Sequence, residues 1–564
     1  MPYLPEFFGG TDVQRSTNLH DNRCINLYPT TNDAGTVVGL VATPGLTFEV
    51  AFPGGAIGSG IYTATNGRCF AVASTVLYEL TVVAGAIVLT NRGTVTAGTV
   101  TRMSDNGLDL ILVNGTDGWL FTFATNALRK IRVASGVCTI SNATPAVITK
   151  TAHTFVAGDK VRFSTTGALP TGLLTSTTYY VLAAGLTADT FEVSLTDGGA
   201  AINTTSAGSG THTVTSLSFG FPNGCKTISY INGRFVACNP NTQAFYCSEK
   251  VNLVTGESNA DWWDALNEMV ADSNPDVVVG AMASHNELIV FGEISGEAFY
   301  DNGAAIVPFT RNVSGVFEVG CIAPYSIAKI DNSVMWLGKS TTGQGIVYRL
   351  NGYTPMRIST YSIEYAMQSM STITDAISFT YQQDGHHFYV LTFPTGGRTF
   401  VFDVNTQLWH ERAGLSLGAL TRWEAQEYAM FNNKHLVCDF AEGRIYSLNL
   451  ASYDDGGVVR KWIRSWRAPA SDMKRVIHHK LMLDCEVGVG LTGGPTPTVM
   501  LKYSDDGGHT WSPEHWRDMG IGSLGEYAKR VFWYRLGQTK AQPRLYELSG
   551  TAAVRTVLLG VYLE

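Results

Sequence analysis

The stretch from His386 to Arg412, HHFYVLTFPTGGRTFVFDVNTQLWHER, is the most informative part of the sequence. Residues 388–393 carry apolar side chains on both faces of an expected strand, as in a strand packed between two layers. Residues 394–397 supply a tight turn, because glycine tolerates the positive φ that hairpins need. A β-branched return strand follows and ends at residues 403–406. Such a hairpin cannot bury both faces alone, so the stretch predicts neighbours of its own kind.

The same unit recurs along the chain. Each copy has an Asn, Asp or Gly turn, an apolar strand, a second turn, and a strand carrying Tyr, Phe or Trp. With the opening hairpin there are seven copies, and the turns of the other six begin at Asn66, Asn106, Asn232, His285, Asp331 and Asn432. The spacing is 40 residues from Asn66 to Asn106, 54 from Asn232 to Asn286, and 46 from Asn286 to Asn332.

One gap breaks this period, since 126 residues separate Asn106 from Asn232. The gap contains residues 138–217, which carry only seven charged residues and nineteen threonines and include three good strand patterns. Removing those 80 residues leaves a spacing of 46, back in register. A period of about 40–50 residues is typical of a β-propeller, whereas a tandem of β-sandwiches would show turns without this regularity.

The predicted fold is therefore all-β: a β-propeller of six or seven blades with an inserted small β domain and a C-terminal β domain. A short helix is expected near Ser359–Tyr365, where a Ser/Thr cap is followed by Glu364. The expected parts are an extended N-terminal arm (1–50), first propeller repeats (51–137), the inserted module (138–217), remaining repeats (218–458) and a C-terminal β domain (459–564).

Composition limits the function classes. Of the 564 residues 15% are charged, glycine reaches 59, and the net charge is −8, which argues against a protein that reads nucleic-acid sequence through a basic face. The nine cysteines form no CxxC pair, so we expect buried free thiols rather than disulfides or a zinc site. No secretory signal and no apolar run of about 18 residues is evident, which predicts synthesis in a cytoplasm and no membrane span.

Two features of the C-terminal region are candidates for binding. A basic, aromatic stretch from Arg460 to Lys480, with Trp462 and Trp466, would suit nucleic acid or, more simply, an edge strand or a subunit interface. Farther on, Ser504-Asp505-Asp506-Gly507-Gly508-His509-Thr510-Trp511 matches S-x-D-x-G-x-T-W. This motif resembles the Asp-box of sialidases and other propellers. Its residues are structural, with the Asp side chain bonding turn amides and the Trp packing beneath: Ser504, Asp506, Gly508, Thr510 and Trp511.

No catalytic, cofactor or metal site can be picked out. A sialidase would need an arginine cluster, a tyrosine nucleophile and a glutamate, and no local pattern singles out such a set. The adjacent pairs His386-His387 and His478-His479 would point to opposite faces of a strand and could not share a metal. No glycine-rich loop with a following lysine suits a nucleotide phosphate. We therefore expect a protein that is not an enzyme and needs no cofactor.

The sequence also resembles a known family. The leader CINLYP…TPGL and, more strongly, residues 285–365 are similar to the packaged-DNA stabilisation protein, or tail hub (nozzle), of short-tailed bacteriophages. The stronger stretch includes HNELIVFGEISGEAFYDNGAA, PFTRNVSGVFEVGCIAPYSIAKID and GIVYRLNGYTPMRISTYSIE. The insert at 138–217 departs from the family's simpler members and resembles β modules inserted in other phage structural proteins.

The resemblance implies a structural virion protein of a short phage tail. It would form a homo-oligomer, expected to be a hexameric ring below the portal and its adaptor, that retains packaged DNA and lets it pass without sequence-specific binding. It would also dock tail fibre, spike or needle proteins. The alternative is a propeller-type receptor-binding or glycan-cleaving phage protein.

Overall fold

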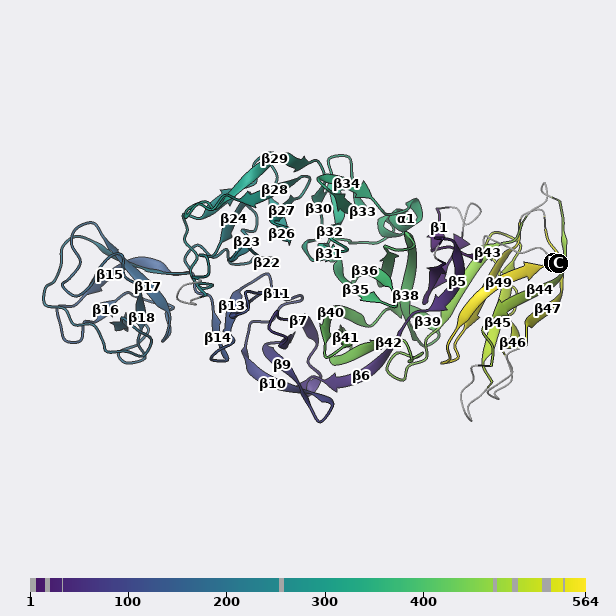
Figure 1. The fold of residues 1–564 in the computed structure, drawn as a ribbon, viewed down its shortest axis with the longest axis horizontal. Helices are drawn as coiled ribbons and strands as arrows, with labels where there is room; N and C mark the ends of the chain where they lie inside the picture. Colours follow the sequence, from purple (N-terminus) through teal and green to yellow (C-terminus); the bar gives the residue numbers. More distant parts are fainter. Residues whose placement is uncertain are drawn as a thin grey trace. The chain divides into compact units, whose positions relative to one another are not determined.

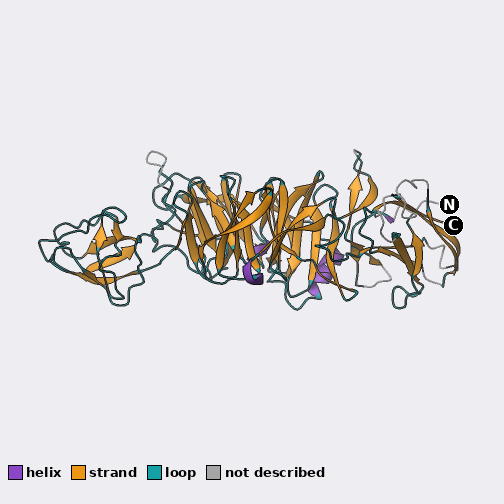
Figure 2. Cartoon of the chain, turned by 90° about the horizontal axis from the view of Figure 1, so that it is seen from below, coloured by secondary structure: helices purple, strands orange, loops and turns teal. Residues whose placement is uncertain are grey.

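The structure is a computed structural model in which strands dominate and α1 (Tyr361–Gln368) is the one α-helix among the described residues (Figures 1 and 2). The residues described are 7–15, 21–32, 34–252, 258–469, 474–488, 496–519, 529–540 and 543–564. The chain divides into two compact units. The first comprises Met1–Thr63, Gly67–Asn91 and Phe317–Glu564, and the second comprises Ala64–Asn66 and Arg92–Val316.

The first unit contains four antiparallel sheets of the propeller-blade type, each with four strands side by side; in one, the first strand is split in two. Three are built from consecutive strands, and the fourth takes a strand from near the N-terminus. Their strands are β7 (Gly58–Thr63), β8 (Cys69–Ala73), β9 (Val76–Val83) and β10 (Ala86–Thr94); the split β30 (Gly320–Cys321) and β31 (Ala328–Ile330) with β32 (Ser333–Ser340), β33 (Gly343–Asn351) and β34 (Thr354–Arg357); β35 (Ile377–Gln383), β36 (His386–Phe393), β37 (Arg398–Asp403) and β38 (Leu408–Ser416), extended by β39 (Ala419–Arg422); and β40 (Ala425–Phe431), β41 (Lys434–Asp439), β42 (Arg444–Asn449) and β6 (Gly45–Ala51).

The second unit contains three further blade sheets and a separate seven-stranded module. The blades are β11 (Arg102–Asp105), β12 (Asp109–Val113), β13 (Gly118–Thr122) and β14 (Ala127–Lys130); β22 (Ile228–Ile231), β23 (Arg234–Cys238), β24 (Ala244–Cys247) and β25 (Glu268–Val270); and β26 (Val278–Ser284), β27 (Glu287–Gly292), β28 (Gly296–Asp301) and β29 (Phe309–Phe317). The module consists of β15 (Ser135–Ile140), β16 (Ile148–Thr149), β17 (Lys160–Thr165), β18 (Tyr179–Val181), β19 (Thr190–Phe191), β20 (Val193–Ser194) and β21 (His212–Ser216). It has its own core, which includes Phe155, Phe163, Tyr179, Phe191 and Val214.

Six of the predicted repeat turns join the first and second strands of their blades, whereas the predicted turn at 394–397 joins the second and third, β36 and β37. In four blades both residues of a two-residue loop have positive φ, as a type I′ turn requires. These loops are Asn232-Gly233, Asp331-Asn332, Asp384-Gly385 and Asn432-Asn433. The seven blade sheets of the described residues therefore follow the sequence period, and the predicted all-β propeller is the right fold class.

The opening stretch shows why the blades need neighbours. Tyr389, Leu391 and Phe393 of β36 pack with residues of the preceding blade, such as Leu337. Phe388 and Val390, on the other face of the same strand, pack with the following blade. Both faces of the strand are buried, as its sequence predicts.

The last blade is completed by the N-terminal segment. Strand β6 pairs with β42 in an antiparallel register that runs from Gly45 opposite Asn449 to Ala51 opposite Arg444. Gly45 lies within 1–50, the stretch predicted to be an extended arm, so the end of this stretch is an integral blade strand. Strand β6, near the start of the chain, thus pairs with a strand that lies about 400 residues later.

The C-terminal region is a two-sheet sandwich that also takes strands from the N-terminal segment. One sheet has the order β3-β43-β48-β45-β46 and the other β4-β5-β49-β44-β47. The strands are β3 (Cys24–Ile25), β4 (Leu27–Thr31), β5 (Val37–Ala42), β43 (Trp462–Arg467), β44 (Ile477–Cys485), β45 (Thr498–Ser504), β46 (His515–Asp518), β47 (Val531–Gln538), β48 (Leu545–Gly550) and β49 (Val557–Leu563). Strand β3 also pairs with β38 and so joins the sandwich to a blade.

Candidate functional site

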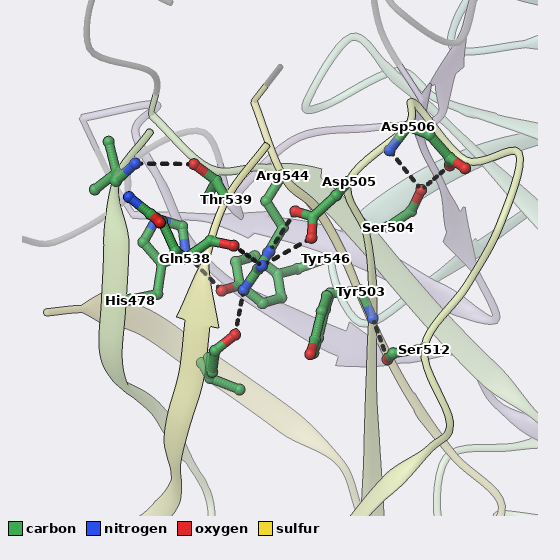
Figure 3. A network of polar contacts seen from close by, with 12 residues as sticks. His478, Tyr503, Ser504, Asp505, Asp506, Ser512, Gln538, Thr539, Arg544 and Tyr546 are labelled. Carbon is green, nitrogen blue, oxygen red and sulfur yellow. Dashed lines mark hydrogen bonds and ion pairs between the residues drawn. The ribbon is translucent and has the colours of Figure 1, made fainter. Parts of the chain in front are cut away.

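The Asp-box residues form a hydrogen-bonded turn directly after β45 (Figure 3). Asp506 Oδ1 accepts hydrogen bonds from the Ser504 hydroxyl at 2.7 Å and the Thr510 N–H at 2.8 Å. Ser504 Oγ accepts one from the Gly508 N–H at 2.8 Å, and Gly508 has a φ of +94°. Hydrogen bonds to Asp506, the strongest from the Thr510 hydroxyl, lower the pKa of its carboxyl. The carboxylate therefore acts as an acceptor that holds the turn.

Trp511, the last residue of the box, is half-buried. Its ring lies 4.5 Å from the Lys502 ammonium, which also pairs with Glu547 Oε1 at 2.8 Å. The ring thus contacts the charged end of a lysine side chain, a lighter packing role than that of a core aromatic.

Asp505, the residue between Ser504 and Asp506, points to the other side and binds Arg544 (Figure 3). The guanidinium donates to Asp505 Oδ1 at 2.7 Å and Oδ2 at 2.9 Å, a bidentate pair. Its remaining donors reach the carbonyls of Leu536 at 2.6 Å and Gln538 at 3.2 Å. The side chain of Arg544 is 2% exposed, so this buried cation links the turn to the end of β47.

Arg544 lies beside an aromatic pair whose chemistry is inert at neutral pH. The Tyr546 hydroxyl and His478 Nδ1 are 2.7 Å apart. Burial raises the pKa of Tyr546, so the phenol keeps its proton and is a poor nucleophile. Burial, aided by the Arg544 charge, lowers the pKa of His478 to about 4, so the imidazole is neutral and can accept the phenol proton's hydrogen bond. The arrangement stabilises the sandwich and offers no activated group.

The basic stretch from Arg460 to Lys480 is largely internal at its start. Arg464 is fully buried and donates to the carbonyls of Phe7 at 2.7 Å and of Gly10 at 3.3 Å. Trp466 is also buried, with its ring 5.0 Å from that of Phe7. Strand β43 lies between β3 and β48, so neither nucleic-acid contact nor an edge strand describes it. Both interpretations are wrong for β43, because the N-terminal segment covers it.

The two histidine pairs divide between inside and outside as their strands predict. His386 is buried, with Nδ1 2.7 Å from Asp403 Oδ2, while His387 is half-buried beside Asp331. His478 is buried and His479 is exposed. Across the described ranges, no group of three or more His, Cys, Asp or Glu side chains could hold a metal ion. All nine cysteines are buried and free, as predicted.

The inserted module is joined to a blade by charged contacts within the second unit. Asp261 accepts from Arg129 of β14 and Lys160 of β17, with its Oδ2 3.0 Å from Lys160 Nζ. Burial alone would raise the pKa of Asp261, but the charges of Arg129 and Lys160 outweigh it and lower the pKa. The Arg162 guanidinium stacks on Trp262 at 4.1 Å. Together these contacts fix β17 to the blade.

Two parts of the chain match models of a known protein family. Residues 187–453 match the family model described as bacteriophage P22 Gp10, β-propeller, and residues 461–564 match the one described as bacteriophage P22 Gp10, β-sandwich. The chain belongs to the phage P22 Gp10 family. It is thus a structural, DNA-stabilising protein of a phage tail, found in the virion and assembled with other virion components.

Solved structures resemble this P22 Gp10 family member only distantly. The N-terminal domain of Nup159 is 6% identical, with 76% of this chain and 99% of that chain covered and a TM-score of 0.36. The Pan2 WD40 domain of Neurospora crassa is 8% identical (74% and 98% covered, TM-score 0.33). The computationally designed Ika8 protein is 9% identical (72% and 100% covered, TM-score 0.33). No curated protein matches the chain in sequence.

Two residue groups of this Gp10 family chain had no clear sequence signal. Arg544 lies 39 residues beyond Asp505, its carboxylate partner, and most of its other partners are backbone carbonyls. Arg464 binds carbonyls near residue 10, which no motif marks. The one usable signal was the acidic Asp505 inside the box, which is free to point away from the turn.

None of the described helices is long and apolar enough to cross a membrane.

Proposed function

We propose that this chain is the hub, or nozzle, of a short phage tail: a homo-oligomeric ring, a hexamer, below the portal and its adaptor. The ring retains packaged DNA, passes it without reading its sequence, and docks fibre, spike or needle proteins. The family supports a tail protein that stabilises DNA. The protein is synthesised in the host cytoplasm and acts without catalysis or a cofactor.

The observation that carries this proposal is the interlocking of propeller and sandwich within the first unit. The N-terminal segment supplies β6 to a blade and β3, β4 and β5 to the sandwich, and β3 pairs with both β38 and β43. Shared strands resist separation because every backbone hydrogen bond across the joint must break at once. A component that retains DNA under pressure needs this mechanical continuity between its parts.

The sandwich network supports a structural role over an enzymatic one. Tyr546 is held protonated by its raised pKa, and Arg544 is saturated by Asp505 and two carbonyls. A glycosidase of the sialidase type would need an activated tyrosine and arginines free to bind a substrate carboxylate. These residues have neither property.

Electron microscopy of the protein, alone and mixed with the portal–adaptor complex of the same virion, tests the proposal. We expect a six-fold ring attached below the adaptor. A particle that never joins that complex, or that forms a trimer or a lone propeller, would favour a receptor-binding protein instead. A rise in melting temperature with a glycan ligand would point the same way, since a ligand stabilises the fold that binds it.

A further inference from the structure

Charge is unevenly distributed along the chain. Residues 461–564, the range of the sandwich match, carry 14 Lys and Arg against 10 Asp and Glu, whereas residues 1–460 carry 25 against 37. The sandwich is therefore basic although the chain as a whole is acidic. The most one-sided acidic stretch is 257–301, with ten carboxylates and no Lys or Arg. These two regions present exposed faces of opposite sign.

The cationic face lies on the outer side of β44 and β47. Lys480 is opposite Tyr534 in the register, and its Nζ lies 4.4 Å from the centre of the Phe532 ring and 5.7 Å from that of Tyr534. Val531 and Trp533 are buried on the inner side, so Arg530, Phe532 and Tyr534 share the outer one. Tyr534 is 57% exposed and Arg530 is exposed.

Strands β44 and β47 and the segments beside them are rich in cations, and Asp484 and Glu486 line the same hollow as Lys529, Arg530 and Phe532. Residues 474–484 and 529–540 contain seven Lys or Arg and a single acid, Asp484. Within the part of the chain that the structure describes, none of these seven forms an ion pair: Lys474, Arg475, Lys480, Lys529, Arg530, Arg535 and Lys540. A cationic surface with exposed aromatic side chains and unused charges is suited to an acidic, partly apolar partner.

The acidic face lies on β25, the outermost strand of its blade. Glu268, Val270 and Asp272 alternate with the buried Met269 and Ala271, so the three point to the exposed side. Asp272 is 62% exposed and pairs with Arg311.

Apolar side chains adjoin these carboxylates. Leu266 is 67% exposed, and Val270 is 44% exposed on β25 itself. Ile306, 58% exposed, belongs to the loop whose Val307 N–H donates to Asn267 Oδ1. The acidic face thus resembles the cationic face in kind, since each combines an excess of charges of one sign with exposed apolar surface.

We propose that the cationic face of one copy binds the acidic face of the next copy in the ring. This inference rests on the proposed ring and names its contact. Joining two different patches of the same chain gives a heterologous contact, which closes into a ring when the rotation permits. Opposite charges select this pairing and oppose contacts between two cationic or two acidic faces. DNA would match the cations but would leave the apolar side chains of both faces unused.

Charge reversal on each face tests the contact. The cationic-face variant carries Lys480→Glu and Arg530→Glu, and the acidic-face variant carries Glu268→Lys and Asp272→Lys. Exposed residues that belong to neither face supply matched controls, Lys329→Glu and Glu318→Lys. Sedimentation velocity and electron microscopy at 50 and 500 mM salt, with and without the portal–adaptor complex, report assembly. Circular dichroism melts confirm that each variant is folded.

We expect each face variant alone to assemble at least tenfold more weakly than the wild type, and the controls to be unchanged. An equimolar mixture of the two variants should form rings with an even number of subunits. The variant that carries all four substitutions should assemble by itself. In both cases faces of opposite charge meet again. Wild-type assembly should weaken at high salt, because the Debye length shortens and the attraction between the two faces is screened.

Three results would overturn the contact. If the variants form rings as well as the wild type does, the proposed hub is retained and the proposed contact between the two faces is wrong. If the cationic-face variant keeps its ring but loses affinity for a duplex DNA probe by fluorescence anisotropy, the face binds nucleic acid instead. If the wild type forms no ring with or without the portal–adaptor complex, the proposed hub fails together with its contact.

Discussion

The inserted module and the C-terminal sandwich are both small β structures, but they are assembled differently. All strands of the module come from one continuous segment, Ser135–Ser216, and enclose their own core. The sandwich draws three of its ten strands from residues 24–42, more than 400 residues before its own β43. The module is therefore a self-contained addition, whereas the sandwich cannot be separated from the start of the chain.

Removing residues 1–31 should break the sandwich. The deletion takes away β3 and β4 and the buried side chains of Phe7, Cys24 and Leu27, each of which packs in the sandwich core. Losing buried aromatic and aliphatic side chains costs about 3 kcal/mol or more each, so the sandwich should be unfolded at 25 °C. Limited proteolysis should cleave within 461–564 of the truncated chain. As the matched case, replacing 135–216 by a short linker should leave the sandwich protected; equal sensitivity in both would contradict the comparison.

Replacing one buried arginine should also show that the sandwich depends on the N-terminal segment. Arg464→Met leaves the carbonyls of Phe7 and Gly10 without their donor, so we expect a loss of about 3 kcal/mol in the free energy of unfolding. Arg555→Met is the control, because Arg555 is an exposed partner of Glu486 and such pairs contribute about 0–1 kcal/mol. Denaturant unfolding followed by tryptophan fluorescence measures both variants. Similar losses would mean that the N-terminal segment is not held through Arg464.

The inserted module is joined to its blade through Asp261, so the next variant changes this residue. Asp261→Asn should weaken the junction with Arg129 and Lys160 by about 1–2 kcal/mol and speed hydrogen exchange in β14 and β17 while leaving the module core protected. The pKa of Asp261 is lowered by folding, so its contribution is present above the unfolded pKa and is lost as the pH falls through the folded value. The difference from wild type should therefore hold from pH 7 to about pH 4 and shrink below it. Loss of protection throughout the module would show that the module depends on its blade.

Trp511→Ala should have an effect no larger than that of Asp261→Asn. A fully buried tryptophan would cost several kcal/mol, but Trp511 is half-buried over Lys502, so we expect about 1–2 kcal/mol. Thermal unfolding of the full chain measures it, with Trp516→Ala, at an exposed position of β46, as the control. A loss as large as that of Arg464→Met would place Trp511 in the core.

Local patterns predicted the blades because a blade is a local structure. The type I′ turns at Asn232, Asp331 and Asn432 need residues that accept positive φ, and the sequence shows them at the predicted repeat positions, whereas the one at Asp384 was not predicted. The helix α1 likewise begins after Thr360, and Glu364 pairs with Arg357 seven residues earlier. The nine buried thiols also follow from the strand pattern in which several of them lie.

Long-range partners were not predictable from local patterns. The pairing of β6 with β42 has no turn to mark it, and the sequence of β43 reads as a basic surface strand until Phe7 and β3 cover it. The Asp-box motif identified Ser504, Asp506 and Thr510, but not that Asp505 would bind Arg544, because most partners of Arg544 are carbonyls, which every residue carries.

The pairing of β6 with β42 sets a minimum time between the synthesis of β6 and the completion of its blade. Translation must proceed from Ala51 to Asn449, about 400 residues, before the partner strand of β6 exists. At about 5–20 residues per second, the ribosome takes on the order of 20–80 s to supply it. Throughout this interval β6 lacks its partner strand, and this early part of the nascent chain must stay unpaired without aggregating. Completion of the blade is thereby linked to completion of the chain, so that truncated products are left with an open edge.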